Sequence, residues 1–241
     1  MSRDTARDPR TLRQLGAVVG VAAVVVVVLV LVSQSGKEKP NASSGAVVAG
    51  AADARAMLQG IPQHGTTLGD PKAPLVLTEF ADMQCPFCRQ YTLYVLPQVI
   101  QRYVRTKRLR LELRLERFIG PESDPAARAA YAAATRDRMW NFVDVFYRNQ
   151  GEENSGYVTG SFLSRIATAA GVPAKFVIAG STSAASDGQV KVAEAQAQAG
   201  ALTSTPSFLI GRRAGRGKQL DIAGLDFSAF SAAIAPELAR R

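Results

Sequence analysis

Two cysteines are the residues of this chain whose type and spacing are best suited to chemistry. They stand at Cys85 and Cys88, separated by Pro86 and Phe87, and they are the only cysteines among 241 residues. The chain has one histidine, His64, so a Ser–His or Cys–His mechanism would have to use that residue. Two cysteines and one histidine cannot complete a four-ligand Cys/His zinc site within one chain. We therefore expect no metal and no other cofactor.

The elements around the cysteines predict a strand-to-helix junction. Residues 75–80 form a short apolar run bounded by Pro74 and Asp82, which predicts a buried strand. Residues 86–104 are predicted to form an amphipathic helix, because apolar side chains recur at four-residue spacing: Tyr91, Val95, Val99 and Tyr103. A thiol at a helix N-terminus faces unpaired backbone N–H groups and the positive end of the helix dipole, and both favour the reactive thiolate. A second cysteine three residues later lies on the same helical face and can resolve a mixed disulfide.

Two other interpretations of the cysteine pair are open from its spacing alone. A structural crosslink would close a loop of about four residues and contribute roughly 2 kcal/mol, less than a longer loop gives. A metal site would leave two positions empty, and His64 could fill only one of them. Redox catalysis is favoured because the C-x-x-C pattern stands at a strand-to-helix junction in a chain with no other cysteine.

The N-terminal segment predicts the compartment. Residues 15–32 are apolar residues and glycine without interruption, and as a helix they would span roughly 27 Å, close to the hydrocarbon thickness of a bilayer. Basic residues are more frequent before this run than after it: Arg3, Arg7, Arg10 and Arg13 against Lys37 and Lys39. We expect residues 1–14 in the cytoplasm, a transmembrane anchor at 15–32, a flexible linker at 33–60, and an extracytoplasmic domain at 61–241 that opens with an irregular lead-in. A cleaved signal peptide is the alternative, and it places the same domain outside the cytoplasm.

Beyond the first helix, the sequence predicts a second strand and a helical region. Residues 108–117 alternate leucine with arginine or glutamate, which predicts a half-buried strand with a solvated, charged face. From about 121 to 202 the chain is rich in alanine and predicts helices at 124–137, 139–148, 159–170 and 186–201. Strand signals at 207–210 and 219–222 flank a turn rich in glycine and arginine, and a helix at 227–238 follows. The fold class is therefore α/β, a small mixed sheet interrupted by a helical block.

The segment around the cysteines resembles a known family. Residues 78–88 read TEFADMQCPFC, which resembles the active-site stretch of the DsbA-like branch of the thioredoxin superfamily. Segments typical of that branch also occur in order at 68–74, 118–123 and 149–156, and residues 203–208 resemble its cis-proline loop. The resemblance implies a thioredoxin fold with an inserted helical subdomain at about 121–202. Together with the predicted anchor, it implies a membrane-anchored, DsbA-like thiol:disulfide oxidoreductase.

The resemblance also implies roles for the cysteines and for the cis-proline loop. Cys85 would be the more exposed nucleophile and Cys88 its resolving partner, and together they would form the redox-active disulfide. The bond between Thr205 and Pro206 would be cis and would face the cysteine pair. The Thr205 backbone would then bind an extended substrate strand with little regard to its sequence.

Two further residues close to the cysteines have predicted roles. Glu79 shares a strand face with apolar neighbours by the period of two, so we expect its carboxyl group to be partly buried, with a raised pKa, and to accept a proton from Cys88. The family also has an acidic residue at this spacing. Phe87 stands where the founding oxidants of the family have histidine, and a phenyl ring offers no charge to a thiolate. We expect a less strongly oxidising couple, with Phe87 as an apolar contact for unfolded substrates.

The expected function is oxidation of cysteine pairs in unfolded secreted proteins, by a monomer that a quinone-linked membrane partner reoxidises. A reductase or isomerase working from the dithiol state is one alternative, and a non-enzymatic anchored binding module with a structural crosslink is another. The formal net charge is +9, but the basic residues at 102–117 are interpreted as a solvated face rather than a nucleic-acid site. We interpret His64 as a surface residue. The core of the helical block is predicted to include Trp140, Phe142, Val143 and Phe146.

Overall fold

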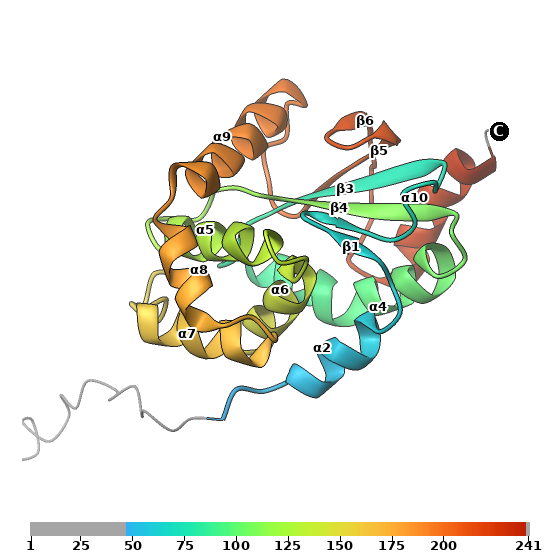
Figure 1. Ribbon diagram of the computed structural model, residues 1–241. Coiled ribbons are helices and arrows are strands. Elements are labelled where there is room, and N and C mark those ends of the chain that lie inside the picture. Colours follow the sequence, from blue (N-terminus) through green and yellow to red (C-terminus); the bar gives the residue numbers. More distant parts are fainter. Residues whose placement is uncertain (1–46, 240–241) are drawn as a thin grey trace, which may run out of the picture. The chain divides into compact units, whose positions relative to one another are not determined.

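The computed structural model describes residues 47–239 and follows the predicted strand–helix–strand order around the cysteines (Figure 1). Strand β3 (Leu75–Ala81) leads into a helical stretch and then into β4 (Leu109–Leu115). The helical stretch consists of α3 (Pro86–Gln90), η1 (Tyr91–Val95), α4 (Leu96–Val99) and η2 (Ile100–Val104). The elements before β3 are α2 (Ala51–Leu58), β1 (Gln63–His64) and β2 (Thr67–Leu68). The elements after β4 are α5 (Ser123–Ala134), α6 (Met139–Arg148), α7 (Gly160–Ala169), α8 (Ala174–Ser181), α9 (Ala184–Ala199), β5 (Ser207–Arg213), β6 (Arg216–Gln219) and α10 (Phe227–Ala239).

Within residues 47–239, six strands form one mixed sheet in the order β1-β2-β4-β3-β5-β6. β3 and β4 are parallel, and the helical stretch from α3 to η2 is the crossover that a parallel pair needs. β5 runs antiparallel to β3 on its other side, so its first residue, Ser207, lies opposite Phe80 near the carboxyl end of β3. The turn that carries the cysteines and the loop that precedes β5 therefore meet at one end of the sheet. The predicted mixed sheet with a helical block is confirmed.

The first helix covers the predicted residues 86–104 but contains two π-helical turns, η1 and η2. Cys85 is its N-cap residue, and Pro86 takes an early helical position where a missing N–H removes no hydrogen bond. Pro97 lies inside the stretch at the start of α4, directly after the wider η1 turn. Because proline has no N–H to donate and its ring crowds the preceding turn, a local change of helical geometry is expected there.

Apolar side chains cover the two faces of the sheet unequally. The α3–η2 stretch and α10 lie on one face, where the ring centroid of Tyr91 is 4.8 Å from that of Phe208 and 5.1 Å from that of Phe230 (Figure 1). Helix α9 lies on the other face (Figure 1). The apolar cluster there is small and comprises Phe80, Ala197 and Leu209, with Leu202 packed against it. The main core therefore lies under the first helix and extends into the helical block.

The helical block consists of α5 to α8, followed by α9. The aromatic and aliphatic residues predicted as its core are buried, as expected: Trp140, Phe142, Val143 and Phe146. Helix α8 was not predicted. Its only buried side chain is Val177, so the segment carries no amphipathic period that could have indicated a helix.

The predicted flexible linker at 33–60 is wrong in its last part, because residues 51–58 form α2. Ala54 and Leu58 of this helix are buried, and Arg105 Nη2 donates to the carbonyl oxygens of Met57 and Gln59 at 3.0 and 3.1 Å. Alanine has the highest helix propensity, which a linker interpretation based on composition overlooks. Residues 33–46 of the predicted linker lie outside the described residues.

The predicted irregular lead-in is also wrong in part, because it contains the short antiparallel pair β1 and β2. β2 extends the sheet by pairing with β4. Runs of two residues are too short to show a period of two in a sequence. His64 in β1 is exposed, as predicted.

The charged face of β4 is largely buried, so the solvated face predicted for residues 108–117 is a further error. Glu112 is 3% exposed. Its carboxylate accepts hydrogen bonds from the hydroxyl groups of Thr66 and Thr67 and pairs with Arg114 at 3.0 Å. Thr67 lies opposite Glu112 across the sheet, so the β1–β2 pair supplies this cover. A period of two separates the faces of a strand but does not reveal what lies over each.

The second strand of the C-terminal hairpin also differs from the prediction, since β6 is Arg216–Gln219 instead of residues 219–222. Gly215 has a φ of +65° and turns the chain directly after β5. All four residues of β6 are exposed, so the strand has no buried apolar face that would mark it in the sequence. The closing helix, α10, agrees with the prediction.

The predicted cytoplasmic segment at 1–14 and transmembrane anchor at 15–32 lie outside the described residues. Among residues 47–239, no helix combines the length and the apolar character needed to cross a bilayer.

Candidate active site

The cysteine pair lies where β3 gives way to α3. Cys85 is the N-cap residue of α3, and its Sγ accepts a hydrogen bond from the N–H of Cys88 at 3.5 Å. Both cysteines are free thiols in the structure, and both are buried: Cys85 is 2% exposed and Cys88 is 0% exposed. The difference in exposure has the predicted sign but is small.

The junction separates the pKa values of the two thiols. The pKa of Cys85 falls to about 6, chiefly because the Cys88 side chain hydrogen-bonds to its sulfur. Burial opposes this fall, while the Thr205 side chain and the backbone N–H groups of Cys88 and Phe87 add to it. Burial and the neighbouring Cys85 raise the pKa of Cys88 well above its ordinary value. At neutral pH, Cys85 is therefore mostly a nucleophilic thiolate and Cys88 a neutral thiol.

The loop before β5 faces this pair. The peptide bond between Thr205 and Pro206 is cis, as the resemblance implied. When it is protonated, the thiol of Cys85 donates to the carbonyl oxygen of Thr205 at 3.2 Å. The hydroxyl group of Thr205 is buried and has no hydrogen-bond partner among residues 47–239, so it is free to turn toward the sulfur. The structure thus brings the predicted cis-proline loop and the predicted nucleophile into contact.

Glu79 lies in β3 on the face covered by the first helix. It is 4% exposed, and burial, followed by the charge of Cys85, raises the pKa of its carboxyl group to about 8. Its Oε1 has no hydrogen-bond partner among the described residues. The charge of Glu79 also raises the pKa of Cys88, so the carboxyl group is within electrostatic reach of both sulfurs. The predicted burial and raised pKa are confirmed, and a carboxyl group that is neutral near pH 7 can exchange a proton with a thiolate.

Asp82 holds the turn between β3 and Cys85. Its side chain is fully buried, and its backbone carbonyl accepts a hydrogen bond from the N–H of Cys85 at 3.0 Å. Both carboxylate oxygens accept hydrogen bonds, which satisfy a buried charge. The donors are the N–H groups of Gln84, Phe118 and Ile119 and the hydroxyl group of Ser123. No role was predicted for Asp82 from the sequence, although an acidic residue between a buried strand and a cysteine was a visible signal.

The model of the family described as Thioredoxin matches residues 63–225, about two thirds of the chain. The chain belongs to the thioredoxin family. A probable disulfide bond formation protein D from Bacillus cereus is 33% identical over 102 residues, which are 42% of this chain and 47% of that protein. The chain therefore spans about half the length of the curated relatives it matches.

Two solved structures share the fold of this chain. The crystal structure of oxidised BdbD from Bacillus subtilis has a TM-score of 0.64 and 20% identity, covering 74% of this chain and 97% of that chain. The structure of DsbA from Chlamydia trachomatis has a TM-score of 0.60 and 21% identity, covering 75% and 95%. The expected thioredoxin fold with a helical insertion is thus confirmed. The expected enzyme class, thiol–disulfide oxidoreductase, agrees with the names of the relatives.

The helical block also holds the turn between β3 and Cys85, through residues for which the sequence predicted no role. Gln150 Nε2 donates to the carbonyl oxygens of Met83 at 2.9 Å and Cys85 at 3.2 Å. Gln84 and Asn154 form a reciprocal pair, with Asn154 N–H donating to Gln84 Oε1 at 2.7 Å and Gln84 Nε2 donating to Asn154 Oδ1 at 3.1 Å. Residues 149–156 resembled the family in sequence, but the contacts that they make could not be read from the chain.

Phe87 lies between the cysteines and is 58% exposed. Phe118, whose N–H binds Asp82, is also largely exposed. Apolar surface therefore flanks the turn that carries the cysteines. The substrate contact predicted for Phe87 stays a prediction. Within residues 47–239, no group of three or more His, Cys, Asp or Glu side chains is placed to hold a metal ion. The side chains assembled here can exchange thiols with disulfides and move one proton.

Proposed function

We propose that this chain is a thiol–disulfide oxidoreductase that oxidises cysteine pairs of unfolded secreted proteins outside the cytoplasm. The separation of the Cys85 and Cys88 pKa values carries the proposal. A low pKa stabilises the Cys85 thiolate, which exists only in the reduced pair, so the disulfide is an oxidant. The family and the names of the Bacillus relatives support the same activity.

The first step breaks the Cys85–Cys88 disulfide. A substrate thiolate attacks Sγ of Cys85, the bond between the two cysteines breaks, and a mixed disulfide joins the substrate to Cys85. Cys88 leaves as a thiolate, which is unfavourable because burial raises its pKa. Glu79, a neutral carboxylic acid below about pH 8, donates the proton that Cys88 takes up, which is the reverse of the proton acceptance expected from the sequence. The carboxylate then regains a proton from solvent.

The second step releases the oxidised substrate. A second substrate thiolate attacks the substrate sulfur of the mixed disulfide, and Cys85 leaves as a thiolate. Leaving is favourable because the pKa of Cys85 is about 6. The substrate has lost two electrons and the cysteine pair has gained them, so a second oxidant must restore the disulfide. We assign this role to a quinone-linked membrane partner.

The expected oxidising strength is intermediate. The Cys85 pKa of about 6 lies below the value of about 7 in thioredoxin and above that of about 3.5 in DsbA. Phe87 fits this position, because it supplies no positive charge to the thiolate. We therefore expect a reduction potential between roughly −270 mV and −120 mV.

Substrate binding and location complete the proposal. Thr205 and Pro206 lie next to Cys85 and would bind an extended chain through the backbone, with Phe87 as an exposed apolar contact. Residues 15–32 would anchor the monomer, with residues 1–14 in the cytoplasm. Binding through the backbone suits a catalyst that acts on many unfolded substrates.

Equilibration of the protein with glutathione buffers tests the proposed direction of transfer. We expect a potential clearly above that of thioredoxin, a mainly oxidised pair in cells, and capture of mixed disulfides by Cys88→Ser through Cys85. Cys85→Ser is the matched control and should capture none. A potential near −270 mV with a mainly reduced pair in cells would instead identify a reductase. Unchanged partner binding by the double serine variant, with no thiol exchange by the wild type, would identify a binding module.

A further inference from the structure

Helix α9 carries the loop that faces the nucleophile. The helix ends at Ala199, and Leu202 N–H donates back to the carbonyl oxygen of Ala197 at 2.9 Å, so the chain leaves the helix in a defined direction. Three residues later, the carbonyl oxygen of Thr205 lies 3.2 Å from Sγ of Cys85. The position of the cis-proline loop relative to the sulfur is therefore set from two sides, by α9 before the loop and by β5, paired with β3, after it.

Apolar contacts alone hold α9 weakly. Its buried side chains are small or few, namely Ser186, Val190, Ala193 and Ala197. The apolar cluster between α9 and the sheet involves only Phe80, Ala197 and Leu209, with Leu202 at its side. A helix with so little apolar contact needs other interactions to keep one position on the sheet.

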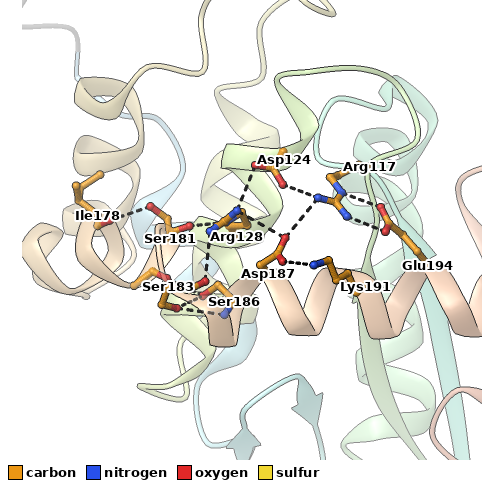
Figure 2. Close-up of polar contacts among 11 residues, drawn as sticks. Arg117, Asp124, Arg128, Ile178, Ser181, Ser183, Ser186, Asp187, Lys191 and Glu194 are labelled. Carbon is orange, nitrogen blue, oxygen red and sulfur yellow. Dashed lines mark hydrogen bonds and ion pairs between the residues drawn. The ribbon is translucent and has the colours of Figure 1, made fainter.

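Two arginines supply those interactions: Arg128 contacts Asp187 at 3.6 Å and the carbonyl oxygen of Ser183 at 3.3 Å, and Arg117, two residues after β4, binds farther along α9. Figure 2 shows the guanidinium group of Arg117 between α5 and α9. Nε and Nη2 each donate to one oxygen of Glu194 at 2.8 Å, which is the two-pronged geometry that only arginine offers. Nη1 contacts Asp124 at 3.1 Å and Asp187 at 3.5 Å. The hydrogen bonds from Arg117 also lower the pKa of Glu194, so this carboxylate stays charged.

The two residues after Arg117 bind the other half of the site. The N–H groups of Phe118 and Ile119 donate to Oδ2 of Asp82 at 2.7 and 2.8 Å, and Asp82 accepts from the N–H of Cys85. Residues 117–119 are therefore tied to the cysteine turn through two N–H groups that bind the Asp82 carboxylate, and to α9 through the Arg117 side chain. This segment connects the nucleophile to the helix that precedes the cis-proline loop, in addition to the pairing of β5 with β3.

We propose that Arg117, through Glu194, is a positioning residue that holds α9 and thereby keeps Thr205 against Cys85. This inference rests on the proposed function, because it concerns the geometry of the same thiol. Arg117 touches neither sulfur. Its loss leaves the start of α9 held by Arg128 but lets the end next to the loop shift, and the contribution of the Thr205 side chain to the low pKa of Cys85 weakens. The expected signature is a less acidic Cys85 and slower exchange in a folded protein.

The test compares Arg117→Gln with Arg117→Lys and Glu194→Gln in the full chain. Lysine keeps the charge but cannot donate to both oxygens of Glu194. The matched control is Lys191→Gln, which removes an ion pair of 2.7 Å to Asp187 in the same cluster without touching Glu194 (Figure 2). The measurements are the Cys85 pKa from thiolate absorbance, the oxidation rate of a dithiol peptide, and unfolding in urea.

We expect each of the three test variants to raise the Cys85 pKa and to slow peptide oxidation about tenfold, since small misplacements cost rate steeply. Lys191→Gln should leave both unchanged. Wild-type pKa and rate in folded Arg117→Gln or Glu194→Gln would overturn the inference, as would equal effects in Lys191→Gln. Cys85→Ser separates this failure from failure of the proposed function: if that variant still oxidises the peptide, the function itself is wrong.

Discussion

At the scale of single residues, the site depends on three acids that do not ionise in their usual order. The thiol of Cys85, with a pKa of about 6, ionises before the buried carboxyl group of Glu79, with a pKa of about 8. Cys88 ionises last, because burial raises its pKa further. Near pH 7 the reduced site therefore holds one thiolate, one thiol and one neutral carboxylic acid. When the disulfide is reduced, proton transfer from Glu79 to Cys88 moves the negative charge from the buried sulfur to the carboxylate, which then regains a proton from solvent.

Replacement of Glu79 by glutamine tests this arrangement. The raised pKa means that Glu79 favours folding below about pH 4.5, and that this contribution is lost as pH rises through about 8. Glu79→Gln does not ionise, so the reduced variant should exceed the wild type in unfolding free energy by about 2–3 kcal/mol near pH 7. The gap should shrink toward pH 5. Urea unfolding measures it, and a gap independent of pH would contradict the assignment.

The same variant should also exchange more slowly. A glutamine side chain is a poor proton donor, so reduction of the disulfide by a dithiol peptide should slow by at least about tenfold in Glu79→Gln. Stopped-flow measurement of thiol release gives the rate. A variant that is more stable but slower would identify Glu79 as a proton-transfer group. A variant that is more stable and has the wild-type rate would show that the buried carboxyl group only destabilises the fold and transfers no proton.

At the scale of elements, the sequence predicted the helices and strands that are marked by apolar periodicity and by the residues that bound them. β3, the extent of the first helix, the core of α6 and the closing helix all follow from apolar spacing. The π turns, α8 and the burial of Glu112 do not: a π turn changes helical geometry without changing the apolar pattern, α8 has no amphipathic period, and Glu112 is covered by threonines far away in the chain. Dependence on distant partners also divides the site: Cys85, Cys88 and Glu79 stand on one strand–helix unit, whereas Asp82, Gln84 and Gln150 act through contacts with the helical block.

The contact between Gln150 and the cysteine turn can be tested against a matched glutamine. Gln150→Leu removes two hydrogen bonds to backbone carbonyl oxygens beside Cys85, so it should lower the unfolding free energy by about 1–2 kcal/mol. Gln98 also donates to a carbonyl oxygen, that of Tyr94, but on an exposed helix surface. Gln98→Leu should change stability by less than about 0.5 kcal/mol. Equal effects in urea unfolding would show that the turn does not depend on the block.

At the scale of the whole molecule, the redox state of one bond should change the stability of the entire fold. The Cys85 pKa is lowered in the folded state, so its contribution is present above about pH 9 and is lost as pH falls through about 6. The oxidised protein has no such thiolate. The reduced form should therefore gain about 2–3 kcal/mol over the oxidised form between pH 5 and pH 8.

Thermal unfolding of both redox forms across this pH range measures the effect. The difference between the two melting temperatures, reduced minus oxidised, should increase with pH. In the Glu79→Gln background the second titrating group is absent, so the pH dependence of the difference comes from Cys85 alone. A difference that is constant or decreasing with pH would show that the thiolate does not stabilise the fold.

The exposed strand β6 has a consequence for a protein that handles unfolded chains. It is the last strand of an open sheet, and its four residues include Arg216 and Lys218. An open edge offers backbone groups to any extended peptide, and such peptides are the proposed substrates. Two cations on so short a strand, with Gly217 between them at a φ of +150°, make the edge a poor template for further pairing. Extended substrates therefore do not pair with this edge of the sheet, and the protein avoids nucleating the aggregation of the unfolded chains on which it acts.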